Sequence, residues 1–188
     1  EETITSTKVP RLVTTELNED RTIVDTNVSE TTTWVDPLAE TFLVDKDGGI
    51  FVKSVDLFFK KKDASIPVRV TIRTTRNGTP TQRIVPGADK ILYPSEIAAQ
   101  ASTTVSGFSN ENASIATNFA FDYPIYLAQD TEYAIVITSQ CDNYEVAVAE
   151  MGGFDLTNTS ERITKQPYGG VFFSSQNAST WTPEQSKD

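Results

Sequence analysis

The sequence contains no histidine and only one cysteine, Cys141. Without histidine the chain cannot form a Ser-His or Cys-His catalytic pair, and it lacks the imidazole ligands of most catalytic zinc sites. With a single cysteine it cannot form an internal disulfide. Because these absences remove most hydrolase classes and zinc sites, we expect a non-enzymatic protein that carries no cofactor.

Long apolar runs are also missing. No segment approaches the roughly 18 consecutive apolar residues of a transmembrane helix, so we expect no membrane insertion. The formal net charge is −10 and the isoelectric point about 4.5. This acidic balance disfavours nucleic acid as a partner, since phosphate binding calls for a basic stripe. The basic run Lys60, Lys61 and Lys62 is interpreted as the solvated end of a hairpin.

The chain has 188 residues, of which 38% are apolar, enough for one domain with its own core. Residues 1–33 are rich in Thr, Ser and Glu, which favours an extended lead-in or linker that packs on a neighbour or stays mobile. Residues 34–188 change to short apolar runs and should form the folded domain. The sequence opens on Glu1 and Glu2 without an initiator methionine, so we expect it to be part of a longer protein.

Short runs of alternating apolar and polar residues recur along the domain. In residues 68–73, Val68, Val70 and Ile72 should face the core, and the two arginines between and after them should face solvent. Asn77-Gly78 predicts a turn, followed by a short return strand at 82–85. Segments 133–138 and 144–149 are predicted to form a hairpin, and residues 95–100 the one helical turn.

This pattern gives about eight to ten short strands with turn signals every 8–12 residues. Two sheets formed from such strands must bury their apolar faces against each other. The sequence therefore predicts an all-β fold, an antiparallel β-sandwich of the jelly-roll kind.

Two groups of acidic residues are candidate sites. Segment 45–49, Asp-Lys-Asp-Gly-Gly, is typical of a hairpin turn, with a weak calcium site at Asp45 and Asp47 as the alternative. The carboxylates of Glu132, Glu145 and Glu150 are the residues that could pair for glycoside hydrolysis. Nothing in their spacing places two of them across a cleft, and alternation should point Glu145 to solvent.

Trp181 is the candidate ligand-stacking residue. It follows Gln176 and Asn177, whose amides could bind a sugar while the sugar ring stacks on the indole, and Tyr168 lies shortly before them. The alternative is that Trp181 closes one end of the sandwich, with its N–H bonded to a nearby carbonyl. Trp34 is interpreted as a residue that pins the lead-in to the domain.

Two stretches together resemble a known family. The first runs through DPLAETF (36–42), GGIFVKSVDLFF (48–59), PVRV (67–70), IR (72–73) and NGTP (77–80). The second is QPYGGVFFSSQN (166–177) with STWT (179–182). The combination resembles a β-sandwich module of the virion structural proteins of T4-like myophages and cyanophages, notably the large baseplate wedge protein. A looser version is similar to jelly-roll modules of bacterial surface and carbohydrate-binding proteins.

The resemblance implies a protein of the virion, in the phage tail or baseplate, made in the bacterial cytoplasm. It implies contacts with other baseplate or tail proteins and no enzymatic turnover. Carbohydrate binding or adhesion to a host receptor on the same fold is the alternative. In that family the pattern continues into a further apolar strand after the tryptophan, so we expect the last strand here to be truncated or supplied by another chain.

Overall fold

The computed structural model describes residues 35–99, 115–153, 161–164, 168–175 and 180–187. The lead-in of residues 1–33 and Trp34 lie outside this part of the chain. None of the described segments forms a helix of the length and hydropathy needed to cross a membrane. The elements are β1 (Val35–Val44), β2 (Ile50–Leu57), β3 (Phe59–Lys61), β4 (Val68–Arg76), β5 (Thr79–Leu92), the 3-10 turn η1 (Pro94–Glu96), β6 (Thr117–Leu127), β7 (Thr131–Ser139), β8 (Glu145–Val146), β9 (Phe172–Ser175) and β10 (Trp181–Glu184).

Six strands form one antiparallel sheet in the order β10-β9-β1-β7-β4-β5, while β2 pairs with β6 and β3 with β8 in two small sheets. The pairing is nested, because β4 pairs with β5, β2 with β6, and β1 with β7. The predicted all-β antiparallel class is therefore confirmed, with ten strands in the described residues. The jelly-roll assignment stays a prediction, which this nested pairing favours.

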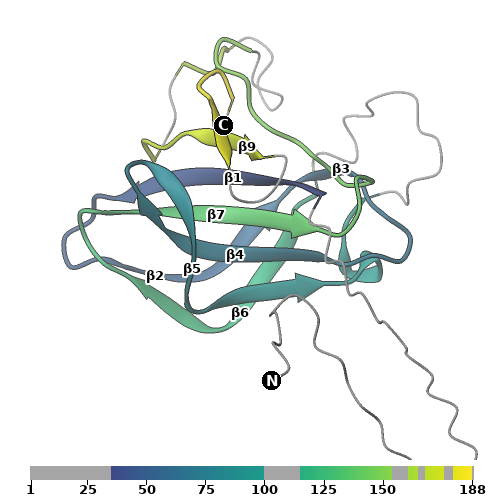
Figure 1. The fold of residues 1–188 in the computed structure, drawn as a ribbon, viewed down its shortest axis with the longest axis horizontal. Helices are drawn as coiled ribbons and strands as arrows, with labels where there is room; N and C mark the ends of the chain where they lie inside the picture. Colours follow the sequence, from purple (N-terminus) through teal and green to yellow (C-terminus); the bar gives the residue numbers. More distant parts are fainter. Residues whose placement is uncertain (1–34, 100–114, 154–160, 165–167, 176–179, 188) are drawn as a thin grey trace, which may run out of the picture. The chain divides into compact units, whose positions relative to one another are not determined.

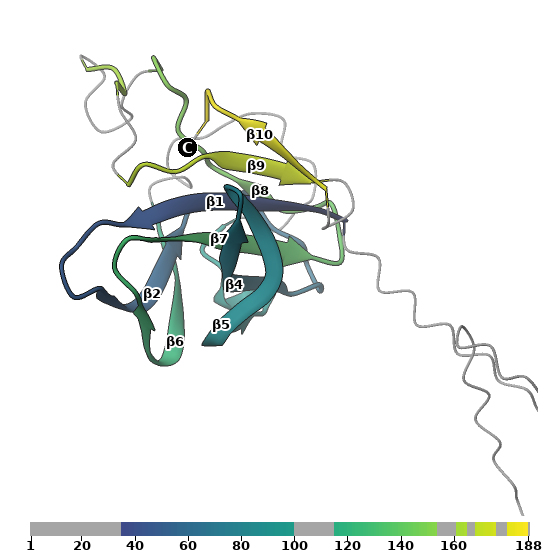
Figure 2. The same ribbon diagram turned by 60° about the vertical axis from the view of Figure 1, so that its left-hand side comes forward.

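The main core lies between the six-stranded sheet and the sheet of β2 and β6 (Figures 1 and 2). Val68, Val70 and Ile72 of β4 are fully buried there, as their alternation predicted. From the other side, Phe119 of β6 is also fully buried, and its ring lies 6.2 Å from that of Phe59. The burial of these two apolar faces against each other is the main source of stability.

Two predicted hairpins were wrong. The segment after β7 pairs with β3, so that Glu145 and Val146 of β8 lie opposite Lys61 and Phe59. Segment 45–49 connects β1 to β2, which belong to different sheets. Both errors have one cause, since the spacing of two strands along the chain does not tell which sheet the second strand joins.

The lysine run is also placed differently. Lys60 and Lys61 belong to β3, and the ammonium of Lys62 donates to the carbonyl oxygens of Pro94 (2.6 Å) and Ile97 (2.7 Å). The run is therefore not a solvated hairpin end, because Lys62 binds the carbonyls that flank η1. The predicted turn at Asn77-Gly78 is confirmed with φ of 53° and 76°, but the strand after it is longer than predicted.

Asp63 joins two loops at the end of the sandwich. One carboxylate oxygen accepts the backbone N–H groups of Ser65 and Ile66, both at 2.7 Å, and the other accepts the amide of Asn143 at 2.6 Å. The residue is only 7% exposed. These hydrogen bonds, the one from Ile66 first, hold the pKa of Asp63 well below its usual range. The ionised form therefore stabilises the fold.

Replacing Asp63 should reveal this contribution through its pH dependence. Because the folded-state pKa is lowered, the stabilisation is present above the unfolded pKa of about 3.9 and is lost as the pH falls through the folded pKa. Asp63→Asn should lower the free energy of unfolding in urea by about 2 kcal/mol at pH 7. The difference from wild type should shrink steadily below about pH 4.

The matched control is Asp142→Asn, which removes an exposed carboxylate from the same end of the molecule. Its effect should stay within about 0.5 kcal/mol at every pH. A difference for Asp63→Asn that does not change between pH 7 and pH 3 would contradict the role of the charge.

Candidate functional site

The face of the six-stranded sheet that points away from the main core carries small side chains. In one row of the register, Phe173, Ala39, Val136 and Thr71 lie side by side on β9, β1, β7 and β4. The next row brings together Thr41, Ala134 and Arg73. We call the five small residues the outer-face floor: Ala39, Thr41, Thr71, Ala134 and Val136. None of the five is more than 1% exposed.

Two elements cover this floor from opposite sides. Trp181 of β10 is half-buried and packs on the cluster formed by Ala39, Ala134, Val136 and Phe173. From the other side, the β4–β5 hairpin curls back, so that β5 contacts β7 and β1 as well as β4 (Figures 1 and 2). The Thr75 hydroxyl donates to the carbonyl oxygen of Glu132 at 3.0 Å and ties the hairpin to β7.

This closure overturns the prediction that the two arginines of residues 68–73 face solvent. Arg69 is half-buried and Arg73 is only 7% exposed. The alternation placed Arg73 correctly on the face away from the main core. It did not reveal that the hairpin covers that face, and so the arginine is buried in a second, smaller layer.

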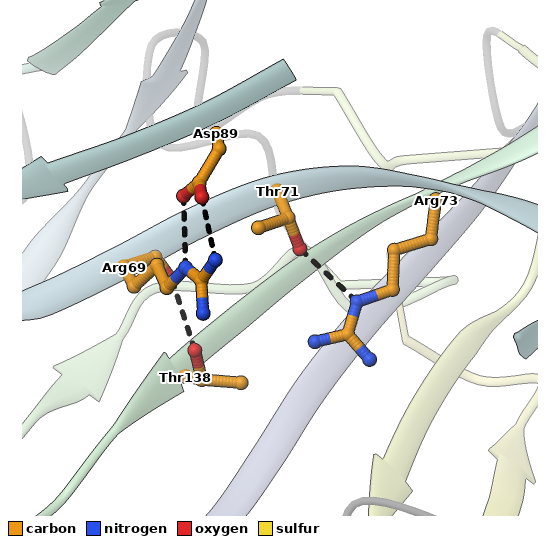
Figure 3. A network of polar contacts seen from close by, with 5 residues as sticks. All are labelled: Arg69, Thr71, Arg73, Asp89 and Thr138. Atoms are coloured by element: carbon orange, nitrogen blue, oxygen red, sulfur yellow. Dashed lines mark hydrogen bonds and ion pairs between the residues drawn. The ribbon is translucent and has the colours of Figure 1, made fainter. Parts of the chain in front are cut away.

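Arg69 forms a two-pronged ion pair with Asp89 of β5 (Figure 3). Its Nε lies 2.8 Å from Oδ1 and its Nη2 2.5 Å from Oδ2. The hydrogen bonding that Arg69 donates to this carboxylate is the main cause of a raised pKa for Arg69. Since the planar guanidinium matches the carboxylate, Arg69 is held in one orientation and its charge is locally neutralised.

Arg73 has only neutral partners. Its Nε donates to the hydroxyl of Thr71 at 3.1 Å and its Nη1 to the amide oxygen of Gln82 at 3.0 Å (Figure 3 shows the first). Within the part of the chain that the structure describes, no carboxylate forms an ion pair with it. Burial, followed by the nearby charge of Arg69, lowers the pKa of Arg73. The charge of Asp89 opposes this lowering, but Asp89 is bonded to Arg69. Arg73 is thus a largely buried cation that has no ion-pair partner of its own among the described residues.

Of the four predicted stacking residues, the structure describes Trp181 and Tyr168. Trp181 is half-buried at the edge of the six-stranded sheet, which favours the alternative that it closes the sandwich. Tyr168 is 71% exposed, and its carbonyl oxygen accepts the N–H of Leu43 at 3.0 Å. Gln176 and Asn177 lie outside the described residues. Ligand stacking at Trp181 stays a prediction.

An exposed aromatic pair occurs instead on the β2–β6 sheet. Phe51 is 72% and Tyr126 50% exposed, and their ring centroids lie 5.3 Å apart. The Tyr126 hydroxyl donates to the carbonyl oxygen of Gly48 at 3.1 Å. Gly49 lies against the same tyrosine with φ of +78°, and a Cβ there would meet the Leu127 carbonyl oxygen at 2.4 Å. Glycine is therefore required at this position.

Gln129 braces the loop of the calcium candidates. Its amide oxygen accepts the N–H of Gly48 at 2.8 Å, and its amide nitrogen donates to Asp47 at 3.1 Å. Across the described segments, no three acidic, cysteine or histidine side chains gather at one point. Calcium takes 6–8 oxygen ligands, so Asp45 and Asp47 would need backbone oxygens and water as well. The calcium site stays a prediction.

The three candidate catalytic carboxylates lie on different elements of the structure. Glu132 lies in β7 and Glu145 in β8, which belong to different sheets, and Glu150 forms an isolated bridge with Lys187. Glu145 is exposed, as predicted, and lies 3.7 Å from the ammonium of Lys61.

The sequence reasoning missed Phe51 and Arg73. A signal existed for Phe51, because alternation places it on the face opposite to Ile50 and Val52. For Arg73 the useful signal was Pro86-Gly87, a pair that marks a bulge within a strand. The register of β5 against β4 does shift here, between the pairs Thr71–Asp89 and Arg73–Ile84.

Removing Trp181 should test whether it is a packing residue. Trp181→Ala should lower the free energy of unfolding by about 2 kcal/mol, less than for a fully buried tryptophan, because the ring is half-buried. Tyr168→Ala is the control, since an exposed tyrosine should change stability by about 0.5 kcal/mol or less. Equal effects of the two variants in urea unfolding would mean that Trp181 does not support the outer-face floor.

We compared the chain with known protein families, with curated proteins and with solved structures. None of these three comparisons gave a match. The site therefore has to be interpreted from its own geometry.

Proposed function

We propose that the chain is a non-enzymatic structural module of a bacteriophage tail or baseplate, which acts in virion assembly through protein–protein contacts. The observation that carries the proposal is where the two family-like stretches lie. Residues 38–40 of the first stretch pair with residues 172–174 of the second in adjacent strands β1 and β9. Trp181, from the end of the second stretch, packs against the buried cluster that contains Ala39 of the first. The resemblance thus concerns one continuous structural unit.

The strand arrangement supports a load-bearing role. Strand β1 is hydrogen-bonded on both sides, to β7 and β9, and β7 is hydrogen-bonded to both β1 and β4. Because these pairings join segments far apart in the sequence, the module resists local deformation. A baseplate that rearranges by rigid-body movement of its parts needs modules of this kind.

The surface supports contacts with other proteins. Large apolar side chains are exposed on both layers: Phe51, Tyr123 and Tyr126 on β2 and β6, and Ile91 in β5 with Tyr93 directly after it. Exposed apolar groups in clusters are typical of surfaces that another molecule covers. Aromatic residues are also the ones that contribute most to protein interfaces.

The location in the virion can be tested directly. Antibodies raised against the purified chain should label the tail or baseplate end of particles of the phage that encodes it, in immunogold electron microscopy. Chemical cross-linking of the same particles should join the chain to tail or baseplate proteins. Antibodies against the major capsid protein, which should label only heads, are the control. Labelling of heads alone, or intact and disrupted particles without any label, would exclude the proposal.

A second candidate function is glycan binding, which the exposed pair Phe51 and Tyr126 favours. Sugar rings stack on aromatic faces, and the hydrogen-bonded side chains of Gln129 and Asp47 lie in the loops that follow β6 and precede β2. If this function holds, Phe51→Ala should weaken binding on a glycan array by about tenfold, the energy of one good aromatic contact. Trp181→Ala, when folded, should leave binding within about twofold. An array without any bound glycan would remove this candidate.

A further inference from the structure

The guanidinium of Arg73 reaches solvent at one point. Its Nη2 makes no hydrogen bond. Among the described residues, Nη2 is not one of the fully buried polar atoms without a partner, so it is in contact with solvent. The residue as a whole is only 7% exposed, so a small part of it, which includes Nη2, is accessible. Of the five N–H groups of an arginine, two are used by Thr71 and Gln82, and three remain available.

Arg69 has an ion-pair partner, whereas Arg73 has none among the described residues. Arg73 runs back along β4 toward Arg69, and Thr71 lies between them (Figure 3). Asp89 neutralises Arg69 through two hydrogen bonds, whereas Arg73 has only a hydroxyl and an amide oxygen as acceptors. A largely buried cation without a counter-ion is unfavourable, and an anion that reaches it would relieve this cost.

We propose that Arg73 binds the carboxylate of an Asp or Glu side chain presented by a partner protein. The inference rests on the proposed function and specifies the chemistry of one of its contacts. A carboxylate fits because the guanidinium can donate two parallel N–H groups to its two oxygens. In the bound state this carboxylate forms the direct ion pair that Arg73 lacks within the described part of the chain, where Asp89 is bonded to Arg69.

Exposed apolar side chains beside Arg69 would contribute to the contact with the same partner protein. Ile91 is the register partner of Arg69 and is 48% exposed. Tyr93 follows two residues later in extended backbone and is 60% exposed. Because alternate residues of a strand share one face, both belong to the face of Arg69 and Asp89. Arg73 itself lies further along the hairpin, opposite Ile84, so Ile91 and Tyr93 would contact the same partner beside Arg69. Exposed Tyr and Ile side chains are suited to such an interface.

The narrow access to Arg73 favours a protein carboxylate over an acidic sugar. A carboxylate at the end of a Glu or Asp side chain can approach a recessed group, whereas in a sugar acid it is attached directly to the ring. The ring would then need space beside Arg73, but Thr41, Thr71 and Ala134 around it are no more than 1% exposed. No surface for a sugar ring is open there.

The test uses the full chain and two peptide probes, Ac-Gly-Glu-Gly-amide and Ac-Gly-Gln-Gly-amide. The Nε–Hε resonances of the arginines are followed by ¹H-¹⁵N NMR while each peptide is added. The Glu peptide should shift the Arg73 resonance in a saturable way, and the Gln peptide should not. Raising the salt concentration from about 0.05 to 0.5 M should weaken the binding, since the Debye length falls several-fold.

Two variants separate Arg73 from general charge effects. Arg73→Lys, which loses the planar fork, should weaken binding of the Glu peptide by about fivefold or more. Arg83→Gln is the matched control, because it removes one positive charge from an exposed side chain on the same hairpin. It should leave the affinity within about twofold. If Arg73→Lys fails to fold, the wild-type resonances still give the answer.

Three results would overturn the proposal: an Arg73 resonance that the Glu peptide does not move, an equal response to the Gln peptide, or tighter binding of glucuronate than of the Glu peptide. The last result would assign the site to an acidic sugar. Each of these results is independent of where antibodies label the virion. Failure at Arg73 and failure of the proposed function can therefore be told apart.

Discussion

Strand β7 is the element on which the rest of the structure depends, because it is hydrogen-bonded on both edges and buried on both faces. It pairs with β1 on one edge and β4 on the other. On one face Tyr133 joins the main core, and on the other Ala134 and Val136 are fully buried. A strand in this position must be packed against other residues on both faces. The main core covers only one face of β7, so a second layer has to cover the other.

The layer that covers the outer face explains which side chains are buried there and which remain exposed. Since the floor consists of small side chains, Trp181 and the β4–β5 hairpin can approach it closely from opposite sides. The tryptophan is thereby used for packing, and the hairpin buries Arg73. A residue expected on the surface thus becomes a recessed cation, and the exposed aromatic pair, Phe51 and Tyr126, lies on the other layer.

Polar side chains stabilise the chain at three places where it leaves the sheets. Lys62 binds the carbonyls that flank η1, Asp63 binds the N–H groups of the following turn, and Gln129 braces the loop between β1 and β2. In each case the side chain supplies a hydrogen bond that the sheet ladders cannot. Arg73 differs, because its neutral partners use only part of its donors and no described residue forms an ion pair with it. That difference is why we assign binding to this residue.

The sequence by itself determined the fold class, the strands of the main core and the turn at Asn77-Gly78, because alternation and turn chemistry act between residues close in the chain. It also pointed to Trp181 but could not distinguish packing from stacking. The tertiary structure decided which strands pair, that β8 joins β3, and that Arg73 is buried. These outcomes depend on contacts between segments far apart in the chain. Pro86-Gly87 marks a bulge in β5, but it does not tell which face the hairpin then covers.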